Sequence, residues 1–264
     1  MISVHQLTKH YGSNPVLRGI DLQIGAGEFV VVLGQSGAGK STLLRCMNRL
    51  AQADGGELQV AGIDAMQARE ERALRRQVAM IFQHHNVVPR LSVLKNVLTG
   101  RLGSLSTLAS ILQLFSRADV ELAHQCLRRV ELMHKAEART DSLSGGQMQR
   151  VGIARALAQR PKVILADEPV ASLDPKTARL VMQYLRDASR DLGITVVCNL
   201  HQVDFAREFG DRIIGLAQGR LVYDGDAGGL DQPTLHRIYP GANEDSQAES
   251  ECSLQLRYTN GLGG

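Results

Sequence analysis

A glycine-rich segment that ends in lysine and serine is the first feature of this sequence that predicts chemistry. It fits the spacing G-x-x-x-x-G-K-[ST], follows the apolar stretch Phe29–Leu33 and precedes a helix-compatible run over residues 42–50. Glycines let the backbone curl so that several N–H groups surround an anion. The segment consists of Gly34, Gln35, Ser36, Gly37, Ala38, Gly39, Lys40 and Ser41. We predict that it binds the phosphate groups of a nucleotide, aided by the positive N-terminal end of the following helix.

The residue types at the end of this segment indicate how the phosphates are held. Lys40 would place a point charge on the β- and γ-phosphates, and the Ser41 hydroxyl would ligate Mg²⁺. The alternative is a glycine-rich turn that exposes a lysine.

Two adjacent carboxylates form a second candidate. The apolar residues 163–166 read as a strand that ends in Asp167 and Glu168, and Pro169 stops it. Neighbouring side chains of a strand point to opposite faces, so we expect the two acids to have different functions. Asp167 suits the coordination shell of Mg²⁺, and Glu168 suits holding or deprotonating a water aimed at the γ-phosphate. The alternative is a pair of surface acids.

The third candidate is the sequence Leu143-Ser144-Gly145-Gly146-Gln147. Ser144 and Gln147 have the spacing of a capping box that opens a helix ending near Arg160, before Pro161. An ordinary helix cap is the simpler interpretation. Two glycines in a first helical turn, however, weaken the helix by roughly 1 kcal/mol each. They favour a helix N-terminus whose bare N–H groups, together with Ser144, contact an anion.

Continuous apolar stretches separated by helical sequence predict the elements that position these residues. The stretches at 29–33, 78–82, 163–166 and 194–198 do not alternate with polar residues, which is typical of a parallel sheet covered on both faces. Residues 2–7, 20–24 and 57–60 predict further strands, and residues 213–216 and 221–223 predict a closing hairpin. Residues 84–141 are helical in character.

Composition excludes several classes of protein. The chain has 264 residues, 44% hydrophobic and 22% charged, which argues against general disorder. The net charge of +3 does not by itself imply a nucleic-acid or membrane partner. No stretch approaches the ~20 apolar residues of a membrane-spanning helix. Cys46, Cys126, Cys198 and Cys252 match no zinc or redox spacing, so we expect single thiols in a soluble cytosolic chain.

Taken together, these motifs and their order resemble ATP-binding-cassette (ABC) ATPases over residues 2–225. The resemblance implies an α/β P-loop ATPase with a mostly parallel core sheet, an antiparallel β subdomain and a helical subdomain. It implies one ATPase domain over residues 1–240, with the helical subdomain at about 84–158, before a polar, flexible tail over 241–264. The expected cofactors are ATP and Mg²⁺. The adjacent His84 and His85 have no metal-ligand spacing.

The resemblance also assigns roles to residues that the spacing alone does not. Tyr11 matches the aromatic residue that stacks on adenine, and Thr42 extends the nucleotide contacts beyond Ser41. Gln83 matches the glutamine that touches Mg²⁺ and the attacking water, and His201 matches the histidine that contacts the γ-phosphate. Asp174 matches a loop acid at the subunit interface. Alternatives are a surface role for Tyr11 and a structural role for His201.

In this family the Ser144–Gln147 motif of one copy completes the phosphate site of a second copy, which implies a head-to-tail homodimer with two ATP. Residues 82–93, 96–103 and 199–206 are similar to phosphonate-importer ATPase subunits. That similarity implies two transmembrane permease subunits, a periplasmic substrate-binding protein that acts indirectly, no nucleic acid, and a peripheral location on the cytoplasmic face of the inner membrane.

Importers of phosphate or amino acids, DNA-repair-type ABC ATPases and P-loop kinases are the alternatives. Residues 105–115 predict either part of a permease-facing surface or ordinary helical core.

Overall fold

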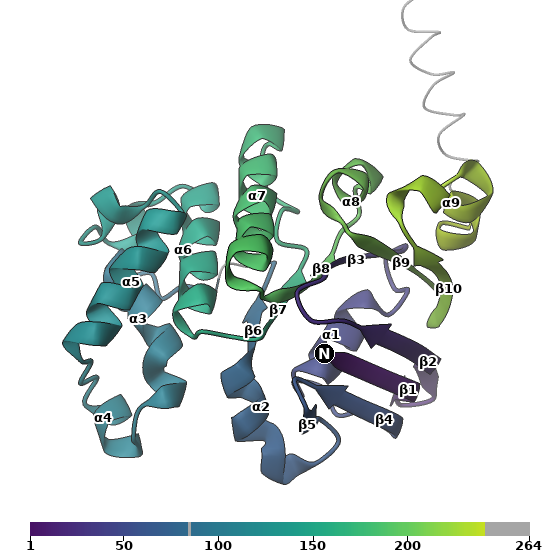
Figure 1. Ribbon diagram of the computed structural model, residues 1–264, viewed down its shortest axis with the longest axis horizontal. Coiled ribbons are helices and arrows are strands. Elements are labelled where there is room, and N and C mark those ends of the chain that lie inside the picture. The colour runs from purple at the N-terminus through teal and green to yellow at the C-terminus, as the bar shows by residue number, and fades with distance from the viewer. Residues whose placement is uncertain (84–85, 241–264) are drawn as a thin grey trace, which may run out of the picture.

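The computed structural model describes residues 1–83 and 86–240, which form two sheets and the helices around them (Figure 1). The larger sheet has six strands in the order β10-β9-β3-β8-β7-β6. Neighbouring strands from β9 to β6 run parallel, and β10 pairs antiparallel with β9. The strands are β3 (Phe29–Leu33), β6 (Val78–Ile81), β7 (Val163–Asp167), β8 (Thr195–Asn199), β9 (Arg212–Ala217) and β10 (Arg220–Gly225). The predicted parallel core sheet and closing hairpin are therefore confirmed.

The smaller sheet is antiparallel, with strand order β2-β1-β4-β5. Its strands are β1 (Ile2–Tyr11), β2 (Asn14–Ile24), β4 (Gly55–Val60) and β5 (Ile63–Asp64). The β1–β2 hairpin is longer than the predicted strands, because pairing continues to Tyr11 and Asn14. Gly12 makes this tight connection with a φ of 61°, which glycine adopts without steric cost.

The continuous apolar strands are explained by burial of both faces of the larger sheet. In β3, Phe29, Val31 and Leu33 belong to the core shared with the helical side of the molecule. Val30 and Val32 belong to a second core with α1 (Lys40–Met47) and the smaller sheet. Figure 1 shows α1 between the two sheets, with α7 and α8 on the opposite side of the larger one. A strand that is buried on both faces has no need of polar alternation.

Helices follow the strands in the order that the sequence predicts. Between β6 and β7 the chain forms α3 (Val93–Leu98), the 3-10 helix η2 (Thr99–Ser104), α4 (Thr107–Ile111), α5 (Arg117–Arg129), η3 (Met133–Lys135), η4 (Thr140–Ser142) and α6 (Gly145–Ala158). The other helices are η1 (Ala68–Glu70), α2 (Glu71–Gln77), α7 (Pro175–Leu192), α8 (Val203–Phe209), η5 (Ala227–Gly229) and α9 (Gln232–Ile238). The helix predicted at 42–50 is α1, which ends at Met47; Arg49 takes a φ of 52°.

Residues 105–115 are not ordinary helical core. Leu108, Ile111, Leu112 and Leu114, in and just after α4, are exposed by 57–73%. Phe115 alone of this stretch packs against the core. The core interpretation is therefore wrong for most of the segment, because most of its apolar side chains are exposed.

Some sequence-based expectations lie outside the described residues, namely those for His84, His85, Cys252 and the tail over 241–264. Cys46, Cys126 and Cys198 are free and buried, as single thiols would be. Among the described helices, none combines the length and apolar character needed to cross a membrane.

Candidate nucleotide-binding site

The phosphate-binding segment joins the end of β3 to the start of α1, as predicted. Two of its glycines are required by close packing. At Gly34 (φ 156°) an added Cβ would collide with the carbonyl oxygen of Leu216. At Gly39 (φ 103°) it would lie 2.9 Å from Leu17 Cδ2, and Gly39 is also the N-cap of α1. The loop between them, Gln35 to Gly37, is exposed, so its backbone can be reached from solvent.

Lys40 is folded into this loop. Its Nζ donates hydrogen bonds to the carbonyl oxygens of Gly34 (2.5 Å) and Gln35 (3.3 Å), and the residue is only 5% exposed. Burial lowers the pKa of Lys40, while the charges of Glu168 and Asp167 act in the opposite direction. The ammonium group is therefore enclosed by the phosphate-binding segment, and the negative charges of Glu168 and Asp167 favour its protonated form.

Asp167, the last residue of β7, is the centre of a small polar network. Its Oδ1 accepts hydrogen bonds from Ser41 Oγ at 2.7 Å and from Asn199 Nδ2 at 2.9 Å. Arg45 of α1 lies 4.0 Å from Oδ2. The Asn199 carboxamide oxygen is buried and has no hydrogen-bond partner. The carboxylate is thus fixed against the first turn of α1, beside an oxygen atom that still lacks a donor.

Glu168 lies just beyond β7 and takes a φ of 51°. The expectation that simple strand alternation separates it from Asp167 is therefore wrong, because the chain has already left the strand. The left-handed backbone turns the carboxylate toward the end of β8, where Glu168 Oε1 lies 2.7 Å from His201 Nε2. A non-glycine residue in this conformation costs about 1–2 kcal/mol, and such strain concentrates at functional sites.

The predicted residues gather because they follow neighbouring parallel strands. The phosphate-binding segment follows β3, His201 follows β8, Asp167 and Glu168 end β7, and Gln83 follows β6. The carboxyl ends of these strands form one edge of the sheet, which is where α/β proteins bind ligands. Gln83 is exposed at this edge.

The Ser144 motif forms the predicted capping box at the start of α6. Ser144 Oγ accepts from the backbone N–H of Gln147, and Gln147 Oε1 accepts from the backbone N–H of Ser144. Gly146 has an additional packing reason, since an added Cβ would collide with the side chain of Thr177 in α7. Within the described part of this single chain, Ser144 makes no hydrogen bond to the phosphate-binding segment.

Tyr11 lies at the end of β1 and is half exposed, with the Lys9 ammonium 5.2 Å from its ring centroid. Asp174 is the N-cap of α7 and accepts from the backbone N–H of Thr177 at 3.0 Å. The hydrogen bonds from Thr177 hold the pKa of Asp174 below its usual value. Both residues are therefore placed by local structure, and neither touches the polar network around Asp167.

Sequence reasoning missed Asn199 and Arg45. Asn199 is the last residue of β8 and directly follows the predicted apolar strand. A polar residue at the end of a buried strand, two positions before His201, was the signal that could have found it. Arg45 carries no comparable signal, because half-exposed arginines on helices are common.

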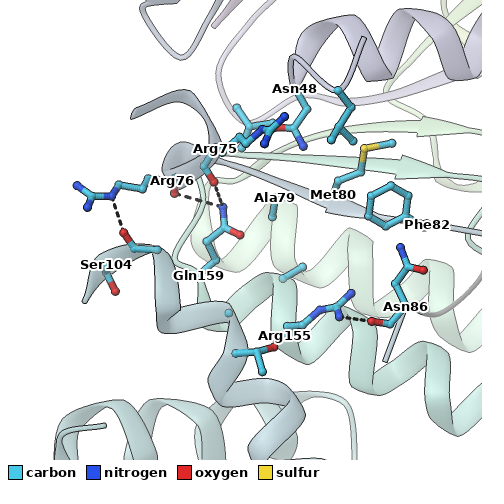
Figure 2. Close-up of a pocket in the computed structure, with 16 residues that line it drawn as sticks. Asn48, Arg75, Arg76, Ala79, Met80, Phe82, Asn86, Ser104, Arg155 and Gln159 are labelled. Carbon is cyan, nitrogen blue, oxygen red and sulfur yellow. Dashed lines mark hydrogen bonds between the residues drawn. The ribbon is translucent and has the colours of Figure 1, made fainter. Parts of the chain in front are cut away.

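A groove of about 700 Å³ lies between β6 and the helices that follow it in the chain (Figure 2). Residues of α2 and β6 form one wall, and residues of η2 and α6 form the other. Arg155 of α6 donates to the Asn86 carbonyl oxygen at 2.5 Å, and burial lowers its pKa. Gln159 donates to the Arg75 carbonyl oxygen at 2.8 Å. Neither Arg76 nor Arg155, both in the groove, has a carboxylate partner among the described residues.

Comparison with known proteins decides the family. The sequence profile described as "ABC transporter" matches residues 17–171, which include the phosphate-binding segment, Ser144 and both acids. This chain belongs to the ABC transporter family. It is therefore an ATP-binding protein and an ABC-type ATPase, and the resemblance seen in its motifs is confirmed.

Curated relatives of this ABC ATPase extend along most of its length. It is 50% identical over 258 residues to the phosphonates import ATP-binding protein PhnC of Thiobacillus denitrificans, covering 97% of this chain and 98% of the relative. It is 53% identical over 228 residues to the protein of the same name in Bacillus anthracis, covering 85% and 89%.

Solved structures agree on the fold. The dimeric structure of a bacterial ABC transporter cassette is 35% identical, with a TM-score of 0.76, and the match covers 87% of this chain and 100% of the cassette. A dimeric cassette in a post-hydrolysis state, bound to ADP and Pi, matches with the same values. The α/β fold predicted from sequence is that of an ABC ATPase.

Proposed function

We propose that this chain is the ATP-hydrolysing subunit of an importer that takes up phosphonates. The observation that carries the substrate class is about 50% identity, over nearly the whole chain, to relatives named for phosphonate import. The sheet edge supplies the machinery for ATP, and the groove beside the helices supplies a surface for a membrane partner. The chain would act at the cytoplasmic face of the membrane, as a peripheral subunit.

The nucleotide would bind along the exposed loop after β3. The backbone N–H groups from Gly34 to Ser41 would surround the phosphates, with Lys40 exchanging its carbonyl partners for phosphate oxygens. Thr42, in the first turn of α1, would extend these contacts. Tyr11, half exposed at the end of β1, offers an aromatic face on which adenine would stack.

The residues present fit Mg²⁺. Ser41 Oγ and Asp167 Oδ1 are 2.7 Å apart, and both are the hard oxygen donors that this ion prefers. The unpartnered Asn199 carboxamide oxygen, next to Asp167, suits a hydrogen bond from an ion-bound water. Gln83 would complete the oxygen set. When bound, the ion would neutralise charge on the β- and γ-phosphates.

Glu168 and His201 would act on the water and on the terminal phosphate. Glu168 would hold the attacking water and accept its proton, since its carboxylate is held at the same edge by His201. His201 would contact the γ-phosphate with its ring, and Gln83 would help to orient the water. These roles require the γ-phosphate to lie between the phosphate-binding segment and the ends of β7 and β8.

Ser144, Gly145, Gly146 and Gln147 would contact the ATP of a second copy. The motif makes no hydrogen bond to the phosphate-binding segment of its own chain, yet it presents a capped helix N-terminus. Such an end attracts anions through its N–H groups and the helix dipole. A head-to-tail homodimer would therefore enclose two ATP, and ATP would favour the closed dimer because it binds that state more tightly.

The groove beside α6 is the surface that we assign to the permease subunits. It has the size for a short helix, and Arg76 and Arg155 would pair with carboxylates of that helix. Gly103 and Ser104 lie in its wall and α4 follows them closely in the chain, so we include the exposed apolar residues of α4 in the proposed surface. A permease helix with acidic and apolar side chains would match both the groove and the exposed residues of α4.

The function is tested by reconstituting the chain with its membrane permease in lipid vesicles and adding purified substrate-binding proteins with their ligands. We expect ATP turnover to rise with a phosphonate and its binding protein. Stimulation by phosphate or by an amino acid instead would reassign the substrate. Stimulation by DNA, without the permease, would contradict the importer function.

The docking surface is tested by co-purification with the permease. Leu108→Ser combined with Ile111→Ser should reduce the amount of permease recovered, while basal ATP hydrolysis stays unchanged. Leu192→Ser is the matched control, because Leu192 is also exposed, by 48%, but lies at the end of α7. Equal recovery for the α4 variant and its control would exclude α4 from the surface.

A further inference from the structure

Helix α9, the last helix in the described part of the chain, packs against β9, the strand next to β3. Ile238 is fully buried, and an added Cβ at Gly215 in β9 would lie 2.6 Å from Ile238 Cγ1. Gly215 pairs with Leu33, the last residue before the phosphate-binding segment. The end of α9 is therefore held close to the site by packing that tolerates no added side chain.

Tyr239, the residue after α9, reaches two of the loops at the sheet edge. Its hydroxyl donates to the backbone carbonyl oxygen of His201 at 3.3 Å. The backbone of Gly34, the first residue of the phosphate-binding segment, lies close enough to the phenol to act on its pKa. A cavity of about 140 Å³ is lined by the rest of that segment on one side and by Ile238 and Pro240 on the other.

The hydroxyl is a dependable donor because it stays protonated. Burial raises the pKa of Tyr239 above its ordinary value, and the nearby Gly34 backbone opposes that shift only in part. The acceptor of this hydrogen bond is the main chain of His201. His201 is exposed and lies in the connection between β8 and α8. Its ring is 2.7 Å from Glu168, and its main chain is tied to α9 through Tyr239.

We propose that Tyr239 is a positioning residue for ATP hydrolysis, which fixes the main chain of His201 relative to the phosphate-binding segment. It acts through His201 and does not touch the nucleotide. This inference rests on the role that the proposed function gives to His201. A misplaced His201 would contact the γ-phosphate and Glu168 less well in the transition state. Binding of ATP in the ground state would be unaffected, because Lys40 and the phosphate-binding segment provide it.

The test is Tyr239→Phe, which keeps the ring and its packing and removes only the hydroxyl. We expect kcat for ATP hydrolysis by the full chain to fall about 2- to 10-fold, the range for one neutral hydrogen bond. KM for ATP should stay within error of the wild type, and the thermal midpoint should fall by no more than a few degrees, as for the loss of a single hydrogen bond. The matched control is Tyr223→Phe, whose hydroxyl donates to the Asp226 carbonyl oxygen at 2.6 Å and should leave kcat unchanged.

A second measurement separates positioning of His201 from a general structural role. In a His201→Ala background, adding Tyr239→Phe should cause no further loss of residual activity, because the two residues act as one unit. An unchanged kcat in Tyr239→Phe, or the same fold loss in both backgrounds, would overturn the inference alone. Wild-type turnover by His201→Ala would overturn both the inference and the role of His201 in the proposed function.

Discussion

The sheet edge and the helical region after β6 differ in how many of their functional residues are held by contacts within the same chain. At the sheet edge, Lys40, Ser41, Asp167, Glu168 and His201 are all held by hydrogen bonds within the chain. In the helical region, the hydrogen bonds of Ser144 among the described residues stay within the first turn of α6, and α4 exposes its apolar side chains. Under the proposed function, one chain would build the hydrolytic groups, whereas their activation and coupling would need other chains.

Glu168→Gln is the change with the largest expected effect at the sheet edge. The amide keeps the shape of the side chain but cannot accept a proton from water. ATP hydrolysis should fall by about 100- to 10,000-fold, as is usual when acid–base catalysis is lost. Nucleotide binding, measured by fluorescence titration with a labelled ATP, should remain within a factor of a few. A variant that hydrolyses ATP at the wild-type rate would exclude Glu168 as the base.

Ser144→Arg tests the helical region. The arginine side chain should prevent the start of α6 from approaching the ATP that a second copy binds. Hydrolysis should therefore fall by at least about 100-fold, the factor expected for lost catalysis. ATP binding by the monomer should not change. Ser116→Arg is the control, because Ser116 forms the same capping box at the start of α5. Each substitution costs about 1 kcal/mol of cap stability.

Mixing two inactive variants tests whether the phosphate-binding segment and Ser144 act across two chains. Ser144→Arg chains and Lys40→Ala chains should both be inactive alone, and a mixed head-to-tail dimer regains one site with an intact loop and an intact Ser144. Turnover that rises on mixing supports a shared site. Turnover that stays at the sum of the two separate samples, with mixed dimers present by mass, contradicts it.

Asn199→Ala removes the amide that holds Asp167. We expect the Mg²⁺ concentration needed for half-maximal hydrolysis to rise by about 10- to 100-fold, as for groups that orient metal ligands. The magnesium dependence of turnover measures this, and excess Mg²⁺ should restore most of the activity. If the half-maximal concentration is unchanged while kcat falls, Asn199 acts on the water and not on Asp167.

Asp119→Asn has the smallest expected effect and is confined to the helical region. Hydrogen bonds from Arg101, and then from Ser116, hold the pKa of Asp119 below its ordinary value. The charged form therefore stabilises the fold above the unfolded-state pKa, and this contribution is lost as the pH falls through the folded-state pKa. The variant should lose about 1–2 kcal/mol at pH 7 in urea unfolding. A deficit that persists undiminished at pH 3 would contradict this origin.

Much of the sheet edge could be predicted from sequence because its signals are local and continuous. The glycine spacing around Lys40 and the acids after an apolar strand each mark one place in the fold, and parallel pairing brings those places together. Asn199 carries no such motif. Its importance follows from a contact with Asp167 across two strands, which only the folded chain brings about.

The helical region was less predictable, because its apolar residues are ambiguous in sequence. Residues 105–115 contain enough leucines for a core helix, yet four of the apolar side chains are exposed. Gly146 shows a similar limit, since its close approach to Thr177 depends on how α6 meets α7. Burial of these residues is set by tertiary packing, which periodicity does not encode.

The most direct test of a site divided between two chains is an experimental structure of Glu168→Gln with ATP and Mg²⁺. We predict a head-to-tail pair in which Ser144 Oγ of one copy lies within hydrogen-bond distance of the γ-phosphate held by Lys40 of the other. ATP bound to separate chains, with Ser144 facing solvent in each, would contradict the account.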